Sequence, residues 1–188
     1  MKKFIIVVII LVAVIGIGIY LAKQASAPVV TNNFAAVPGD TALLANLKKA
    51  GLDPLTAEGS VMHIHQHLDI TINDQPQTVP GEIGIGTTFI SPVHTHDDTG
   101  IIHVESPVQK DFQLGQFFDE WGVDFSDAQI GTNKVDSSHK LLLAVNGTAL
   151  KNNYRGYVLK AHDEIEIWYG PVAENPNLIK AYAFAPGL

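Results

Sequence analysis

Six of the eight histidines in this chain of 188 residues fall in two tight groups between positions 63 and 103. At the chain's own histidine frequency, about two would be expected in that interval. Neutral imidazole nitrogens are common ligands of zinc and of copper(II). The clustering therefore predicts a site for one or two divalent metal ions, zinc or copper. The histidines concerned are His63, His65, His67, His94, His96 and His103.

Two histidines at positions i and i+2 of an extended segment place their imidazoles near enough to share an ion, and a third from a neighbouring strand completes the set. We expect His94, His96 and His103 to be the first ligands. A fourth ligand, or a second site, is expected from His65 or its neighbours His63 and His67. Three imidazoles with one open position are typical of catalytic zinc, and the same ligands suit copper(II).

The rest of the composition limits the ligand types and partners that the chain can use. The chain has no cysteine, which excludes disulfides, thiolate nucleophiles and metal sites built on sulfur from cysteine. Its net charge of -7 argues against a nucleic-acid partner and favours attraction of cations. Three carboxylates near the second histidine group, Asp97, Asp98 and Glu105, are available to orient an imidazole through its other ring nitrogen. No feature of the sequence indicates an oligomeric state.

The element that must carry the first histidine group is an extended strand beginning near Val61. Its even positions are mostly apolar, from Met62 and Ile64 to Ile72, with Gln66 as the exception, whereas its odd positions carry the three histidines. Side chains alternate between the two faces of a strand. The apolar row is therefore expected to face the core, with all three imidazoles on the opposite face.

Other patterns predict a mixture of helices and strands. Apolar residues three and four apart predict a short helix after Asp40-Thr41 that stops at Gly51, and an amphipathic helix from Asp111 or Gln113 to Trp121 that stops at Gly122. Alternating or β-branched runs predict further strands, with turns at Asn73-Asp74 and Asn146-Gly147. These strands are expected at residues 101–105, 141–145 and 164–169, with a return strand from Gln77 toward Ile85 and a short strand at residues 157–159.

The N-terminus indicates the cellular location. Lys2 and Lys3 precede an uncharged apolar run from Phe4 to Ala22, which is long enough to span a bilayer and is oriented with its leading lysines in the cytoplasm. The small residues 25–27 also suit a cleaved signal peptide, although Pro28 fits poorly after a cleavage point. We expect a membrane anchor at residues 1–22, a linker at 23–39 and one extracytoplasmic metal-binding domain at 40–188. The domain would be secreted if residues 1–27 are removed.

Several segments of the C-terminal half resemble the β-grasp fold of ubiquitin-like and small sulfur-carrier proteins. These are the helix Leu114-Gly115-Gln116-Phe117-Phe118, the strand end Val145-Asn146-Gly147 and the last strand introduced by residues 159–167. The carriers end in Gly-Gly, whereas Gly170 is followed here by Pro171, so the resemblance implies the fold and not sulfur transfer. The histidine triplet, with His-Thr-His-Asp and Gly-Ile-Ile-His, also resembles a set of extracytoplasmic bacterial or archaeal proteins and implies no activity. The predicted class is α+β, with a mixed β-sheet.

A cupin-like β-barrel is the alternative fold. Pro92-Val93-His94-Thr95-His96 is similar to the opening of the cupin metal motif. The cupin pattern requires a glutamate four or five residues after the second histidine, and Gly100 and Ile101 occupy those positions.

Three functions remain compatible with the sequence. The first is capture or handling of zinc or copper outside the cytoplasm. The second is an enzyme, such as a carbonic anhydrase, in which zinc-bound water of pKa about 7 attacks a small electrophile. The third is a cell-surface interaction module in which the metal is structural.

Overall fold

The computed structural model describes Phe34 and residues 36–188. The predicted anchor at residues 1–22 and most of the predicted linker lie outside these residues. Within the described part of the chain, no helix is long and apolar enough to cross a membrane.

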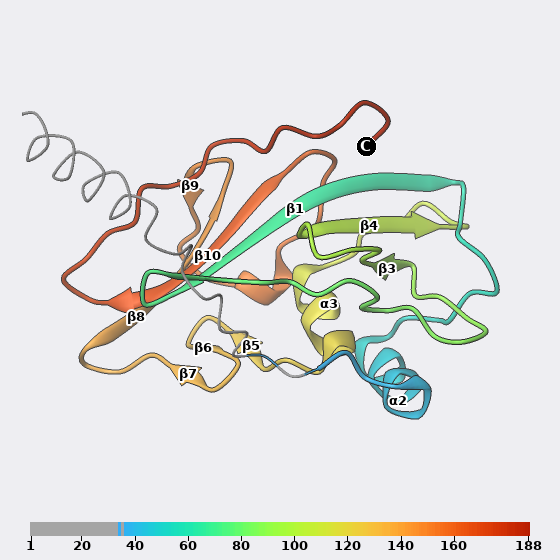
Figure 1. Cartoon of the computed structure of the whole chain (residues 1–188), viewed down its shortest axis with the longest axis horizontal. Helices are drawn as coiled ribbons and strands as arrows, with labels where there is room; N and C mark the ends of the chain where they lie inside the picture. The colour runs from blue at the N-terminus through green and yellow to red at the C-terminus, as the bar shows by residue number, and fades with distance from the viewer. Residues whose placement is uncertain (1–33, 35) are drawn as a thin grey trace, which may run out of the picture.

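A mixed sheet forms the centre of the fold, and its strands follow the order β3-β4-β1-β10-β8-β9, with β2 also paired to β1 (Figure 1). The central pair, β1 and β10, is parallel, and the other pairs are antiparallel. The strands are β1 (Met62–Ile72), β2 (Gln75–Gln77), β3 (Val93–His94), β4 (Ile101–Ser106), β8 (His139–Val145), β9 (Thr148–Ala149) and β10 (Glu164–Pro171).

The long strand β1 organises the sheet because its two halves have different neighbours. Residues 62–67 pair with β4, whereas residues 67–72 pair with β10 on one side and partly with β2 on the other. The even positions of β1 face the core as predicted: Leu68, Ile70 and Ile72 are buried. Burial of each such side chain contributes about 1.5–3 kcal/mol, which fixes the register and with it the direction of the odd-numbered histidines.

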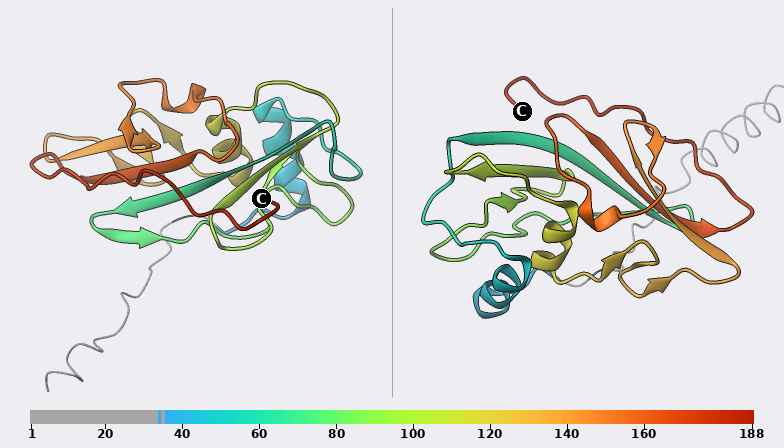
Figure 2. Two further views of the ribbon diagram at one scale, coloured as in Figure 1. Left: turned by 90° about the horizontal axis from the view of Figure 1, so that it is seen from above. Right: turned by 180° about the vertical axis from the view of Figure 1, so that it is seen from behind.

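Two helices lie on the core side of the sheet: α3 (Leu114–Trp121), and α2 (Asp40–Ala50), which packs against α3. The apolar stripe of α3 is buried, including Phe117, Phe118 and Trp121. A capping box between Gln113 and Gln116 begins this helix, and Gly122 ends it in the left-handed conformation with φ 79°. The C-terminal segment after β10 runs along the opposite face of the sheet (Figure 2). The sheet therefore has a helical side and a side shared by the histidines and the C-terminal segment.

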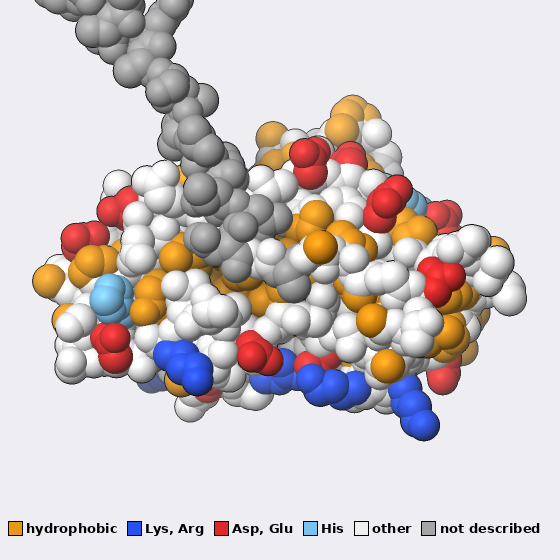
Figure 3. Space-filling view, turned by 60° about the horizontal axis from the view of Figure 1, so that its bottom comes forward, with side chains coloured by type: hydrophobic (Ala, Val, Ile, Leu, Met, Phe, Trp, Pro, Cys, Tyr) orange, Lys and Arg blue, Asp and Glu red, His pale blue; other side chains and the backbone are white. Residues whose placement is uncertain are grey.

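Small elements complete the fold. The strands β5 (Phe125–Ser126), β6 (Gln129–Ile130) and β7 (Asn133–Lys134) form a separate three-stranded sheet, and a 3-10 turn occupies Tyr154–Gly156. From the side that carries α2, little histidine surface is visible, and only at the margins of the molecule (Figure 3).

The predicted α+β class and mixed sheet are confirmed. The cupin alternative is wrong, because the strands between residues 62 and 171 form an open sheet and not a closed barrel. The return strand predicted from Gln77 toward Ile85 is wrong. The strand that pairs with β1 there is β2, which ends at Gln77, since Pro80 and the glycines that follow favour turns, and Ile85 takes part only in an isolated bridge to Ile90. Residues 157–159 likewise form only one bridge, from Val158 to Gln113.

Candidate metal centre

Three adjacent strands bring five histidines and one glutamate to the same face of the sheet. In the antiparallel pairing of β1 with β4, His63 lies opposite Glu105 and His65 opposite His103. In the pairing of β3 with β4, His94 lies opposite His103. His96 follows the end of β3, and its ring centroid lies 4.7 Å from that of His94 and 4.5 Å from that of His103, on the same face.

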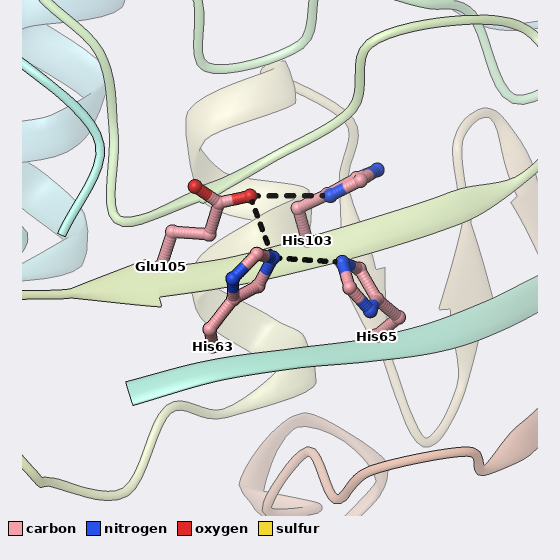
Figure 4. Close-up of side chains that lie close together, drawn as sticks. All are labelled: His63, His65, His103 and Glu105. Carbon is pink, nitrogen blue, oxygen red and sulfur yellow. Dashed lines mark hydrogen bonds and ion pairs between the residues drawn. The ribbon is translucent and has the colours of Figure 1, made fainter. Parts of the chain in front are cut away.

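The first ligand group joins β1 and β4 and consists of His63, His65, His103 and Glu105 (Figure 4). The Nε2 atoms of His63 and His65 are 3.1 Å apart. Oε1 of Glu105 lies 3.3 Å from Nε2 of His63 and 3.3 Å from Nδ1 of His103. The side chain of Glu105 is buried and that of His103 is 13% exposed, whereas that of His63 is 53% exposed, so the group opens to solvent on the His63 side.

The second ligand group joins β3 and β4 and consists of His94, His96, His103 and Glu105. The Nε2 atoms of His94 and His96 are 3.2 Å apart, and Oε1 of Glu105 is 4.0 Å from Nε2 of His94. His94 is fully buried, and the side chain of His96 is 42% exposed. His103 and Glu105 are therefore shared between the two groups.

These distances suit a metal ion. Zinc–imidazole bonds of about 2.0–2.1 Å place two nitrogens of a tetrahedral zinc about 3.3–3.4 Å apart. The 3.1 and 3.2 Å separations within the two His-x-His pairs are close to that value. Small movements of the rings would be enough to seat an ion between the members of either pair.

Burial keeps the central imidazoles neutral. It lowers the pKa of His94 to about 4 and that of His103 to about 3, and neighbouring histidines act in the same direction on His103. Burial, together with His63, also lowers the pKa of His65. A neutral imidazole has a lone pair to offer a metal, whereas an imidazolium does not. Near neutral pH these three side chains are therefore in the form that binds metal ions.

Glu105 supplies the negative charge of the site. Burial raises the pKa of its carboxyl, and nearby Glu58 acts in the same direction, whereas His63 and His96 oppose them. Among the described residues, no lysine or arginine forms an ion pair with Glu105; the nitrogens within 4.0 Å of its Oε1 belong to His63, His94 and His103. A buried carboxylate surrounded by neutral imidazoles is stabilised by a cation between them.

A hydrogen bond orients the buried ring of His94. Its Nδ1 lies 2.9 Å from the backbone carbonyl oxygen of Ser91, which fixes Nδ1 as the donor and leaves the Nε2 lone pair for the metal. Gly84 allows this loop to approach, because a Cβ atom there would lie 2.6 Å from the Val93 carbonyl oxygen and 3.1 Å from Cβ of His94. The carboxylate of Asp97 instead accepts hydrogen bonds from Thr99, and Asp98 is exposed.

His67 lies apart from the other five predicted ligands. Its Nδ1 is 2.8 Å from Oε2 of Glu164, and its Nε2 is 2.9 Å from the carbonyl oxygen of Thr99. Burial lowers the pKa of His67, but Glu164, Asp69 and the Thr99 carbonyl oxygen together outweigh this effect and the pKa is raised. Tyr182 of the C-terminal segment stacks on the ring at 3.8 Å between centroids. Both ring nitrogens of His67 are thus engaged, one with Glu164 and one with the Thr99 carbonyl oxygen, and neither is free for a metal ion.

A third cluster, His67, Asp69 and Glu164, has the spacing of a ligand group. Its histidine is engaged in the ion pair, so the geometry favours a structural role for this cluster. The two remaining histidines lie outside all three groups. His139 stacks on Tyr169, and His162 contacts the Leu188 carbonyl oxygen at 2.9 Å.

Sequence reasoning missed Glu58, whose Oε1 lies 3.5 Å from Nε2 of His96. It belongs to the loop between α2 and β1, which contains no histidine. Glu105 was expected to orient an imidazole, and it lies within reach of the ligand nitrogens themselves. Its place opposite His63 depends on the pairing of β1 with β4.

Comparison with protein family models, with curated proteins and with solved structures found no match for this chain. The function must therefore be argued from the chemistry of the site. The buried histidine and glutamate groups could hold a metal ion.

Proposed function

We propose that this chain is an extracytoplasmic metal-binding protein that captures or handles zinc or copper through five clustered histidines, His63, His65, His94, His96 and His103. One observation carries the proposal: five imidazoles and a buried glutamate converge on one sheet face, and no lysine or arginine of the described residues neutralises that glutamate. Imidazole nitrogen and carboxylate oxygen without sulfur from cysteine suit zinc and copper(II).

The proposal is tested on the full-length chain purified without a histidine tag. The protein is stripped with a chelator, dialysed against buffered zinc or copper(II), and analysed for bound metal and melting temperature. At a free metal concentration 100 times the dissociation constant, binding to the folded state adds about 2.7 kcal/mol of stability. For a chain of this size that corresponds to a rise in melting temperature of roughly 5–11 °C.

The matched control is His139→Ala, which removes a partly exposed histidine outside the ligand groups and should bind metal as the wild type does. His65→Ala removes a buried ligand and should weaken binding. If the wild type retains no metal and neither zinc nor copper raises its melting temperature, the proposed function is wrong.

The membrane anchor at residues 1–22 is part of the same proposal. The support is the uncharged apolar run preceded by Lys2 and Lys3. Fractionation of cells that express the full chain tests it. Retention in membranes after alkaline carbonate extraction, with residues 40–188 open to external protease, is the expected result, whereas a soluble cytoplasmic chain would contradict it.

We further propose that the sheet has a β-grasp arrangement. The support is the parallel central pair β1 and β10, flanked by antiparallel β4 and β8, with α3 between β4 and β8 in the chain. The arrangement begins at β1, so it extends further toward the N-terminus than residue 101. Nuclear Overhauser contacts across β1 and β10 would test this pairing, and their absence would refute it.

A further inference from the structure

The two ligand groups of the histidine face cannot merge into one coordination sphere as they stand. Ligand atoms bound to a single ion at about 2.0–2.2 Å lie no more than about 4.4 Å from one another. Each group satisfies a similar limit, since its ligand atoms all lie within 4.8 Å of one another. Across the described residues, no such group contains both the His63/His65 pair and the His94/His96 pair. One ion therefore cannot use all five imidazoles in this arrangement.

Glu105 stands between the two pairs. Its Oε1 is 3.3 Å from Nε2 of His63 on one side and 4.0 Å from Nε2 of His94 on the other. A carboxylate has two oxygens with about four lone-pair positions, so it can bind two cations at once. Metal ions in paired sites are typically about 3.5–4 Å apart. The position of Glu105 fits that of a carboxylate between two such ions.

We propose that the histidine face holds two metal ions side by side, one at the His63/His65 pair and one at the His94/His96 pair, with the Glu105 carboxylate bridging them. This inference rests on the proposed function, because it concerns the same metal-binding face. His103 lies between the pairs, with its ring centroid 4.5 Å from that of His65 and 4.5 Å from that of His96. Its Nδ1 offers one lone pair and therefore joins the coordination sphere of one of the two ions.

The charges around the two pairs fit this occupancy. The Glu105 carboxylate lies at both pairs, and the Glu58 carboxylate lies 3.5 Å from Nε2 of His96 at the second pair. The two carboxylates repel each other. Two divalent cations would offset this repulsion, because each carboxylate would then lie beside a positive charge. The buried Nδ1 atom of His103 has no hydrogen-bond partner, which leaves it available as a ligand atom.

The test compares the zinc content of single variants that each damage one pair. His63 and His96 are the most exposed ligands, with side chains 53% and 42% exposed, so their replacement by alanine should leave the fold intact. We expect two zinc ions per full-length wild-type chain, one in His63→Ala, one in His96→Ala and none bound tightly in the double variant. His139→Ala, the control, should keep two.

Copper(II) then reports the distance between the ions. Electron paramagnetic resonance of wild type loaded with two copper ions should show a magnetically coupled pair. His63→Ala and His96→Ala loaded with one should each show an isolated copper signal. Melting temperatures of the metal-free variants within about 2 °C of wild type, less than 1 kcal/mol, confirm that they are folded.

The outcomes separate the two proposals. One zinc ion per wild-type chain, abolished by either single variant, would overturn the paired site and leave the proposed metal-binding function standing. No zinc at all would overturn both. Two zinc ions with two isolated copper signals in the wild type would overturn the bridging role of Glu105.

Discussion

Glu120 should make this protein less stable as the pH rises. The residue lies in α3, is fully buried, and no hydrogen bond of normal geometry reaches either of its carboxylate oxygens in the described structure. Burial raises the pKa of the Glu120 carboxyl well above its usual range, and Ser91 only partly opposes this effect. Glu120 is therefore protonated in the folded chain at pH values where the unfolded chain has already lost that proton.

The sign and size follow from this difference in proton binding. Below the carboxyl's ordinary pKa of 4.5, both states hold the proton and Glu120 adds no pH dependence. Above it, the free energy of unfolding falls by about 1.4 kcal/mol per pH unit until the folded carboxyl also ionises. For a domain of this size, that slope corresponds to roughly 3–6 °C in melting temperature per pH unit. Glu120→Gln keeps the shape of the side chain and removes this contribution.

The assay is differential scanning calorimetry of wild type and Glu120→Gln from about pH 4 to pH 9 with chelator present, so that metal binding does not contribute. The melting-temperature difference, variant minus wild type, should grow with pH. Burying the glutamine amide shifts the melting temperature by an amount that does not depend on pH. The test is therefore how the melting-temperature difference changes with pH. Glu174→Gln, at an exposed acid, is the control and should follow the wild type. Parallel curves for wild type and Glu120→Gln would refute the reasoning.

Three further predictions concern the site and its support. His103→Ala removes the imidazole that both ligand groups share. Zinc affinity in calorimetric titration should fall by more than about 100-fold, since loss of a residue that only orients a ligand already costs about 10–100-fold. Unchanged zinc affinity would contradict this prediction. Glu164→Gln breaks the buried pair with His67 and should lower the free energy of unfolding in urea by about 3–5 kcal/mol while the zinc content stays the same. A loss of zinc would show that the cluster of His67, Asp69 and Glu164 binds metal. Gly84→Ala should destabilise the metal-free chain by about 1–3 kcal/mol, because φ is 79° there and a Cβ atom would meet the Val93 carbonyl oxygen, and a neutral effect would contradict this.

Much of the local structure could be predicted because short-range patterns determine it. The alternation along β1 separates apolar from histidine positions, and the spacing of Phe117, Phe118 and Trp121 specifies the buried stripe of α3. Gly122 and Asn146-Gly147 mark ends because the left-handed conformation found there suits glycine and asparagine. Such signals depend on a few neighbouring residues, so the linear sequence contains them.

The composition of the candidate site was only partly predictable. The clustering of the histidines indicated a metal, and alternation placed His63, His65 and His67 on one face. It could not separate His67 from the other two, because the partner that occupies His67 is Glu164, 97 positions away. Nor could it find Glu58 beside His96.

By itself, the sequence determined the kind of ligand that the chain offers, imidazole and carboxylate without cysteine, and the strand face on which the first histidines lie. Only the tertiary structure decided which of those side chains meet. The pairing of β1 with β4 sets Glu105 opposite His63, and the pairing of β3 with β4 sets His94 opposite His103. The physical reason is that strand pairing joins segments that are distant in the chain, through hydrogen bonds between backbone groups that every residue carries. A ligand group made across strands therefore leaves no local mark in the sequence.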